Sequence, residues 1–356
     1  MSIFSRQSNK ESSINAKTEA IQEQLAEKMM GFFDSVIEDR SKYYAEHQDK
    51  IPNQDSIKAI IQTYASKNAL ISGGAGLVPG PLGMLAAVPE IGFVIRNQIE
   101  MIYDIGTAYG KKQVLTKELL AGVFSTAIGS GALGLLTVQG SKVLVKRASL
   151  RFLQKAVQLL AGKVTQRMLR SMVSKYVPVA GAAAMAAWSN LSTRTIGKQA
   201  TIIFEKEITI SSEDPEEFLE TEASKLQDTS QIIEDAEQSL EEKLDILKIQ
   251  SLINLMMIDG QIESEEQEYI GLIVEGAEIN DHIKMDLIEA ITGKTKFKID
   301  YSEFTNSPDE KISLLVDMVA LAKRDGEFHI AEKLLIKQVG KIFDFSTDEI
   351  EEVMAS

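Results

Sequence analysis

The chain has 356 residues, 44% of them hydrophobic and 25% charged, and it contains no cysteine. The absence of cysteine excludes disulfides, thiol nucleophiles and cysteine-ligated zinc sites. Residues 1–205 carry 24 Lys and Arg against 15 Asp and Glu, whereas residues 206–356 carry 14 against 37, and so large a step predicts two modules with different surroundings.

The N-terminal segment, residues 1–62, is predicted to be helical. Apolar residues recur every three to four positions between residues 14 and 44, from Ile21 to Ile37, which is typical of an amphipathic helix. We expect this helix to pack on its own domain, with binding to a partner or to a membrane surface as the alternative. A second helix is expected over residues 55–70.

Residues 68–89 form an uncharged stretch of 22 residues that is long enough to span a bilayer. Its glycines and its prolines at positions 79, 81 and 89 disfavour one straight span, and they favour two short helices joined by a turn. A further helix is predicted over residues 90–109, with Gly110 as its C-cap.

Two more uncharged stretches, rich in Gly and Ala, follow at residues 119–141 and 176–193. Their small residues allow helices to approach closely, either in lipid or in a soluble bundle, yet contribute little to membrane insertion. Three alternatives therefore stay open: a polytopic membrane protein, a soluble bundle that touches or conditionally enters the membrane, and a wholly soluble core. Because few runs alternate as strands do, the predicted fold class is all-α, with a central Gly/Ala-rich helical bundle.

The strongest electrostatic signal lies between these two stretches. Residues 111–200 hold 14 Lys and Arg and a single acid, Glu118. A helix over residues 150–172 would combine an apolar stripe with basic faces, a pattern typical of membrane surfaces. The predicted contacts with anionic lipid are Arg151, Lys155, Lys163, Arg167 and Arg170. The alternatives are a solvated cationic face or pairing with the acidic half. Nucleic acid is not expected, because no aromatic stacking platform accompanies these cations.

An acidic linker, residues 206–243, leads to a duplicated motif with the pattern Asp-Gly-x-apolar-x-x-x-Glu. The motif begins at Asp259 and again 66 residues later at Asp325, and its flanks also match. Each copy predicts two helices joined by a glycine turn, and two such hairpins can pack around a pseudo-twofold axis. The acidic residues either cap the turn and the following helix, or they supply oxygen ligands for Ca²⁺ or Mg²⁺. The candidate metal ligands are Asp259, Glu266, Asp325 and Glu332.

The duplicated unit and its acidic surroundings resemble the TerB-like domains of the tellurite-resistance family over residues 244–356. The resemblance implies an all-helical domain, an association with membrane-linked stress systems, and a divalent-metal site at the four carboxylates named above. Glu263 and His329 depart from the family pattern, which has Ser or Asp there.

Residues 63–205 resemble the EcsC family. The residues that carry this resemblance are Gly76 to Gly83, Val88 to Ile91, Gln98, Ala108 to Gly110, Val177 to Gly181, Asn190, Thr193 and Gly197. Glu90 stands where the pattern more often has Asp. EcsC-like proteins are bacterial and membrane-associated, so the resemblance implies a location more than a mechanism.

Together these features predict a non-enzymatic bacterial protein of envelope or stress physiology. We expect it in the cytoplasm, peripheral to or conditionally inserted into the inner face of the cell membrane. Its expected partners are anionic lipid and a protein that meets the acidic domain, and self-association into a homo-oligomer is a further option. The alternative function is a conditional pore-forming or membrane-remodelling protein that inserts the uncharged stretches as helical hairpins.

Overall fold

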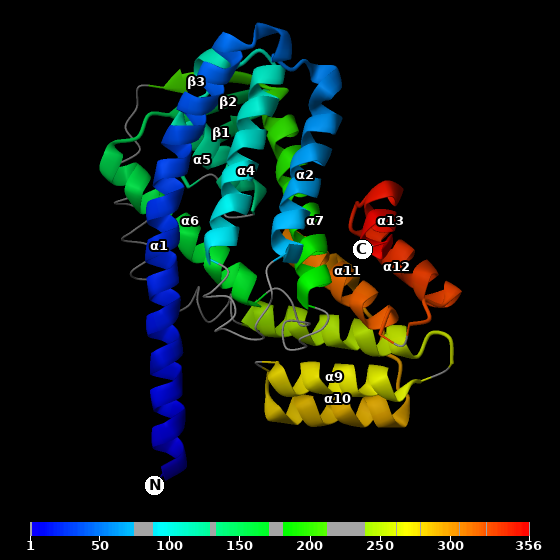
Figure 1. Cartoon of the computed structure of the whole chain (residues 1–356). Coiled ribbons are helices and arrows are strands. Elements are labelled where there is room, and N and C mark those ends of the chain that lie inside the picture. The colour runs from blue at the N-terminus through cyan, green and yellow to red at the C-terminus, as the bar shows by residue number, and fades with distance from the viewer. Residues whose placement is uncertain are drawn as a thin grey trace.

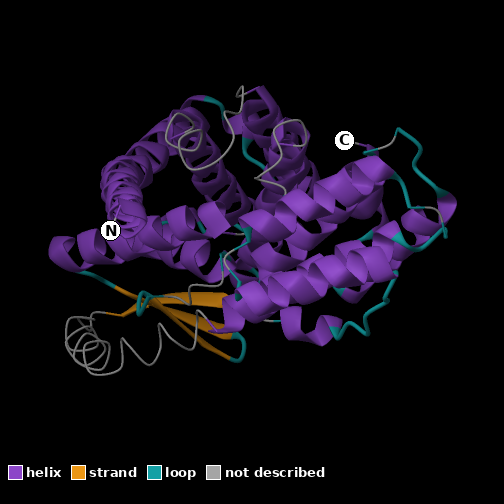
Figure 2. Ribbon diagram, turned by 90° about the horizontal axis from the view of Figure 1, so that it is seen from below, coloured by secondary structure: helices purple, strands orange, loops and turns teal. Residues whose placement is uncertain are grey.

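The computed structural model describes residues 2–74, 88–128, 133–170, 181–211, 239–260, 262–277, 279–305, 307–324 and 326–355. Across these residues the protein is built from helices, with one small sheet at the edge of the helical body (Figures 1 and 2). The predicted all-α class is confirmed. The sheet is a feature that the sequence analysis did not include.

The N-terminal and central helices share one core and form what we call the central module, residues 2–211. Its helices are α1 (Ser2–Glu46), α2 (Ile57–Gly74), α4 (Val88–Ala108), α5 (Lys117–Ala127), α6 (Leu150–Arg170) and α7 (Gly181–Phe204). Single turns of 3-10 helix lie at Gln48–Lys50, Gln54–Ser56 and Lys112–Val114. The boundary at residue 62 falls inside α2.

Helix α1 is amphipathic, as its apolar spacing predicts. Leu25, Met29, Phe33 and Val36 are buried and pack with α4, α5 and α6. The first turns of α1 extend beyond the rest of the molecule (Figure 1). At the end of α4, Gly110 has a φ of +70°, the left-handed conformation expected of a glycine that ends a helix.

The sheet has three strands, β1 (Leu136–Gln139), β2 (Lys142–Lys146) and β3 (Glu207–Ser211). β1 and β2 form an antiparallel hairpin that turns at Gly140, whose φ is +58°, and β3 pairs parallel to β2. Val143 and Val145 are buried, which is the alternation of a strand with one covered face. The sheet thus joins the chain after α5 to the chain after α7.

One of the uncharged stretches, residues 119–141, adopts another structure than a helical hairpin where it is described. Residues 119–141 form the buried helix α5 and, after residues 129–132, strand β1. Residues 75–87 and 171–180 lie outside the described part of the chain. Among the described residues, no helix has both the length and the apolar character needed to cross a bilayer.

The C-terminal module, residues 239–355, has its own core. Its elements are a helix over residues 239–256, then α9 (Ser264–Gly276), α10 (Asp281–Gly293), a 3-10 turn (Tyr301–Phe304), α11 (Pro308–Ala322), α12 (Ile330–Ile342) and α13 (Thr347–Ala355). It lies against the side of the central module that α7 forms (Figure 1).

A buried ionic network holds α1 and α2 to α4. The Arg40 guanidinium donates to both carboxylate oxygens of Asp104, at 2.8 and 2.6 Å, and the hydroxyls of Tyr44 and Tyr64 donate to the same carboxylate. Burial raises the pKa of both tyrosines, so their hydroxyls stay protonated as donors. The Asp104 side chain is 6% exposed, and it therefore depends on these four hydrogen bonds.

We predict that Arg40→Ala lowers the free energy of unfolding by about 3–5 kcal/mol, because it leaves the buried Asp104 carboxylate without its counter-charge. Chemical denaturation would measure the loss. Lys50→Ala is the matched control, since Lys50 pairs with Asp49 at 3.6 Å and both side chains are largely exposed; it should cost less than about 0.5 kcal/mol. Equal costs for the two variants would contradict a special role of Arg40.

Candidate functional site

The two copies of the duplicated motif have the same backbone turn. Gly260 has a φ of +86° and Gly326 a φ of +85°, a region that glycine enters without steric cost. Three pairs of flanking positions are equally buried in the core, namely Leu255 with Leu321, Ile270 with Ile336, and Ile273 with Val339. The sequence repeat is therefore a structural repeat of helix, glycine turn and helix.

The motif glutamates each cap the helix that follows the turn. The Glu266 carboxylate accepts from the Glu263 backbone N–H at 3.5 Å, and the Glu332 carboxylate accepts from the His329 N–H at 2.8 Å. In both copies the side chain of the N-cap residue also accepts from the backbone N–H of the third helical residue. These are capping boxes in which Glu263 and His329 replace the usual Ser or Thr.

The two modules meet on α7, where cations of the basic half face acids of the acidic half. Arg194 pairs with Glu352, and Asn190 donates to the same carboxylate while accepting from Arg194. One turn further, Lys198 donates to Glu349 at 2.7 Å. The basic and acidic halves of the chain therefore bind each other at this face.

The cations of α6 are arranged differently. Arg151, Lys155 and Lys163 are exposed on one face of α6, spaced by multiples of four residues. None of the three forms an ion pair with any residue in the described ranges. Arg167 and Arg170 continue the helix, but their side chains lie outside the description.

Comparison with known proteins bears on the C-terminal half. Residues 248–355 match the family model of tellurite resistance protein TerB. The C-terminal module contains a TerB domain. No curated protein and no solved structure matches the chain. The family match leaves out residues 63–205, so the EcsC-like resemblance of the central module stays a prediction.

Three of the four predicted metal ligands of the TerB domain lie within the described residues. Asp259, Glu266 and Glu332 do not come together in a group that could hold a metal ion, and no such group of three His, Asp or Glu side chains occurs elsewhere among the described residues. Asp325 lies outside the description. The Ca²⁺ or Mg²⁺ site therefore stays a prediction.

We predict that Gly260→Ala and Gly326→Ala each lower the free energy of unfolding by about 1–2 kcal/mol, because an L-residue is strained at their positive φ. Gly271→Ala is the matched control. Gly271 lies within α9, and an added Cβ would meet no atom within 4 Å; this variant should gain about 0.5–1 kcal/mol. Urea titration of the three variants would test the difference, and a loss at Gly271 with no loss at the other two would contradict it.

A buried lysine that sequence reasoning missed lies at the start of the matched TerB region. Lys248 is 0% exposed and donates to Asp245 at 2.6 Å and to Glu310 at 2.7 Å. Burial lowers the pKa of Lys248, but the two carboxylates outweigh that effect and raise it, so the lysine is charged. Helix periodicity could have placed Lys248 among apolar neighbours, but Glu310 is 62 residues away in sequence.

Several residues that carry the EcsC-like resemblance form a buried polar cluster between α2, α4 and α7. Gln98 and Asn68 both donate to the Thr193 hydroxyl, at 3.1 and 2.9 Å, and Thr193 donates to the Ser189 carbonyl. Gly197 lies where α7 touches α2, and a Cβ there would be 2.6 Å from Ile61. Gln98, Thr193 and Gly197 thus fix how the three helices pack.

The interface acid Glu349 has two roles. Its carboxylate accepts from the Ser346 backbone N–H at 2.8 Å, which caps α13, and from Lys198 of α7. Burial raises the pKa of Glu349, but the hydrogen bonds from Lys198 and Ser346 outweigh it and hold the pKa below the usual value. Because the folded pKa is lowered, Glu349 stabilises the folded state above pH 4.5 and loses that effect as the pH falls below it.

We predict that thermal stability falls more steeply between pH 5 and pH 3 in the wild-type chain than in Glu349→Gln, which has no carboxylate to titrate. At pH 7 the Glu349→Gln chain should melt at the lower temperature. Glu351→Gln is the control, because Glu351 pairs with Lys337 within the TerB domain and is 56% exposed. Identical pH profiles for the wild type and Glu349→Gln would refute the contribution of Glu349.

Proposed function

We propose that the protein is a non-enzymatic, membrane-associated protein of bacterial stress or envelope physiology. In this proposal α6 of the central module binds anionic lipid at the cytoplasmic face of the membrane, and the TerB domain is held on α7. The TerB match supports the link to stress physiology, since the family is described by tellurite resistance. The acidic surface of the TerB domain would meet a protein partner, and it is also where Ca²⁺ or Mg²⁺ would act.

One contrast carries the proposal: the cations of α7 are neutralised by the TerB domain, whereas the described cations of α6 are not. Arg151, Lys155 and Lys163 project from one exposed face, and Leu150 and Leu159 beside them are 62% and 41% exposed. Each cation near an anionic leaflet contributes about 1 kcal/mol, so three contribute roughly 3 kcal/mol, and the two leucines add apolar contact. Because the whole chain has a net charge of −14, attraction to an anionic surface has to be local to such a face.

We predict that the full chain sediments with vesicles of phosphatidylglycerol and phosphatidylcholine at low salt, but not with phosphatidylcholine alone. Lys155→Glu/Lys163→Glu should weaken this binding by at least about tenfold, because two attractive charges become repulsive. Salt at 0.5 M should release the wild-type chain, since screening shortens the reach of surface charges.

The matched control is Lys296→Glu/Lys298→Glu, which makes the same change in net charge at exposed positions after α10. It should sediment like the wild type. Equal binding to neutral and anionic vesicles, or equal loss in both double variants, would reject lipid binding through α6. Vesicles filled with dye would test the alternative in the same experiment, because a pore-forming or remodelling protein releases the dye and a peripheral one does not.

A further inference from the structure

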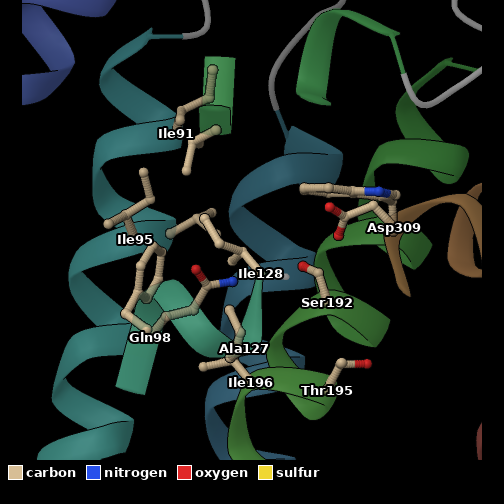
Figure 3. Close-up of a pocket in the computed structure, with 13 residues that line it drawn as sticks. Ile91, Ile95, Gln98, Ala127, Ile128, Ser192, Thr195, Ile196 and Asp309 are labelled. Carbon is tan, nitrogen blue, oxygen red and sulfur yellow. The ribbon is translucent and has the colours of Figure 1, made fainter. Parts of the chain in front are cut away.

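The pocket between the two modules has room for a few water molecules and not for a larger ligand. Ile95 and Gln98 of α4 and Ser192 of α7 are among the residues that line it (Figure 3), and its free volume is about 40 Å³. The outer surface of the TerB domain offers more to a partner, because two of its helices present large apolar side chains to solvent.

Helix α12 has an exposed face that is apolar and basic. The helix packs on α11 and α13, and on its outer side Ile330, Leu334 and Ile342 are 63%, 60% and 47% exposed. Their spacing by four and eight residues places them along one side of the helix. Lys341 is exposed beside them and forms no ion pair with a residue in the described ranges. A row of this kind is typical of a protein-binding surface rather than of scattered apolar residues.

Helix α10 has an exposed face that is apolar and acidic. It packs on α9 and forms the lower edge of the TerB domain in Figure 1. Met285 and Ile288 are 62% and 44% exposed. Asp281 and Glu289 lie one turn before and one turn after Met285, are exposed, and form no ion pair with a described residue. The faces of α10 and α12 are therefore alike in apolar character and opposite in charge.

We propose that the α12 face of one copy of the chain binds the α10 face of a second copy. The apolar side chains pack together, and the lysines of α12 meet the acids of α10. Contact between two α12 faces would bring lysines against lysines, and contact between two α10 faces would bring acids against acids, and like charges repel in both. The contact thus joins different surfaces of the two copies and can be repeated from copy to copy.

The internal repeat contains a precedent for this contact. A shift of 66 residues places α10 on α13, and the N-cap Asn280 on Ser346, which caps α13. Helix α13 docks on a basic helix, because its Glu352 pairs with Arg194 of α7. Asp286 of α10 has the position of Glu352, and its side chain is 64% exposed. The first copy of the repeat thus keeps an acidic helix surface open where the second copy has docked the equivalent one.

The expected association is weak and is best seen at moderate salt. Each helix has 13 residues and is about 20 Å long, so one contact is smaller than a standard interface, and we expect a Kd on the order of 10–100 µM. Both copies have a net charge of −14 and repel each other at low salt. At 0.15 M salt the Debye length is about 8 Å, so distant charges are screened more than those in contact.

The inference takes up the protein partner proposed above for the acidic surface and identifies it as a second copy of the chain. It rests on that part of the proposed function and not on the binding of α6 to lipid. The two are distinguishable, because the test below contains no vesicles and includes a variant of α6.

The test is sedimentation equilibrium of the full chain between 5 and 200 µM at 0.15 M salt. The weight-average mass of the wild type should rise with concentration. Leu334→Ser/Lys341→Ser removes an apolar side chain and a charge from α12, and Met285→Ser/Glu289→Ser does the same on α10. Each double variant alone should bind itself at least about tenfold more weakly than the wild type, since it lacks one of the two faces.

An equimolar mixture of the two double variants decides the matter. The first variant keeps the α10 face and the second keeps the α12 face, so the mixture should form pairs with one copy of each variant and nothing larger. A wild type that stays monomeric at 200 µM, or a mixture that stays monomeric, would overturn the proposal. Self-association of either variant alone, at the strength of the wild type, would overturn it as well, because it would show contact between two identical faces.

Two matched controls carry the same kinds of change elsewhere. Leu159→Ser/Lys163→Ser alters an exposed leucine and a lysine of α6, and Leu272→Ser/Glu275→Ser alters an exposed leucine and a glutamate of α9. Both should associate like the wild type. Loss of association in the α6 control would show that α6, and not α12, is the basic helix that binds α10, and would refute the assignment.

Discussion

The arrangement of the molecule depends on α7, one helix that belongs to two cores. Trp188 and Leu191 in its first half are buried with the C-terminal module, and Ile196, Ala200 and Ile203 in its second half are buried with the central module. Burial of a large apolar side chain contributes about 1.5–3 kcal/mol. The two modules cannot separate without exposing Trp188 and Leu191. The hydrophobic effect therefore holds them together independently of the ion pairs between them.

Two ion pairs then fix which face of the TerB domain lies on α7. Arg194 and Lys198 are four residues apart and lie on one face of the helix, and Glu349 and Glu352 are three apart on α13, so the two pairs match in spacing. Glu349 is also fixed by its capping contact with Ser346, which lowers the entropy lost when it meets Lys198. The geometry gives the TerB domain one orientation on the central module.

The charge split predicted two modules, but the sum of charges along a chain does not show which cation meets which acid. The same basic half supplies Lys198, which binds Glu349, and Lys155, which faces solvent. Only packing distinguishes them, because α6 turns its apolar stripe toward α1 and leaves its cations outside, whereas the cations of α7 face α13. Composition left open whether the basic and acidic halves bind each other, and the structure shows that they do at α7.

Local features were accessible to sequence reasoning, and long-range ones were not. Asp-Gly followed by Glu seven positions after the Asp predicts a glycine turn and a capped helix, and both copies show it at Gly260 and Gly326. The Arg40–Asp104 pair and the Lys248–Glu310 pair each join residues more than 60 positions apart. The sheet was missed for the same reason, since β2 pairs with β3 across α6 and α7.

The row of cations on α6 has an energetic consequence. Like charges spaced by four residues on a helix destabilise it by about 0.2–0.5 kcal/mol per pair, and Arg151 and Lys155 are spaced in this way and form no ion pair with a residue in the described ranges. The helix is maintained by its buried face, on which Phe152, Val157 and Leu160 are at most 2% exposed. An anionic surface would offset this repulsion without any change in the core, so the proposed lipid contact would relieve a cost that the free protein carries.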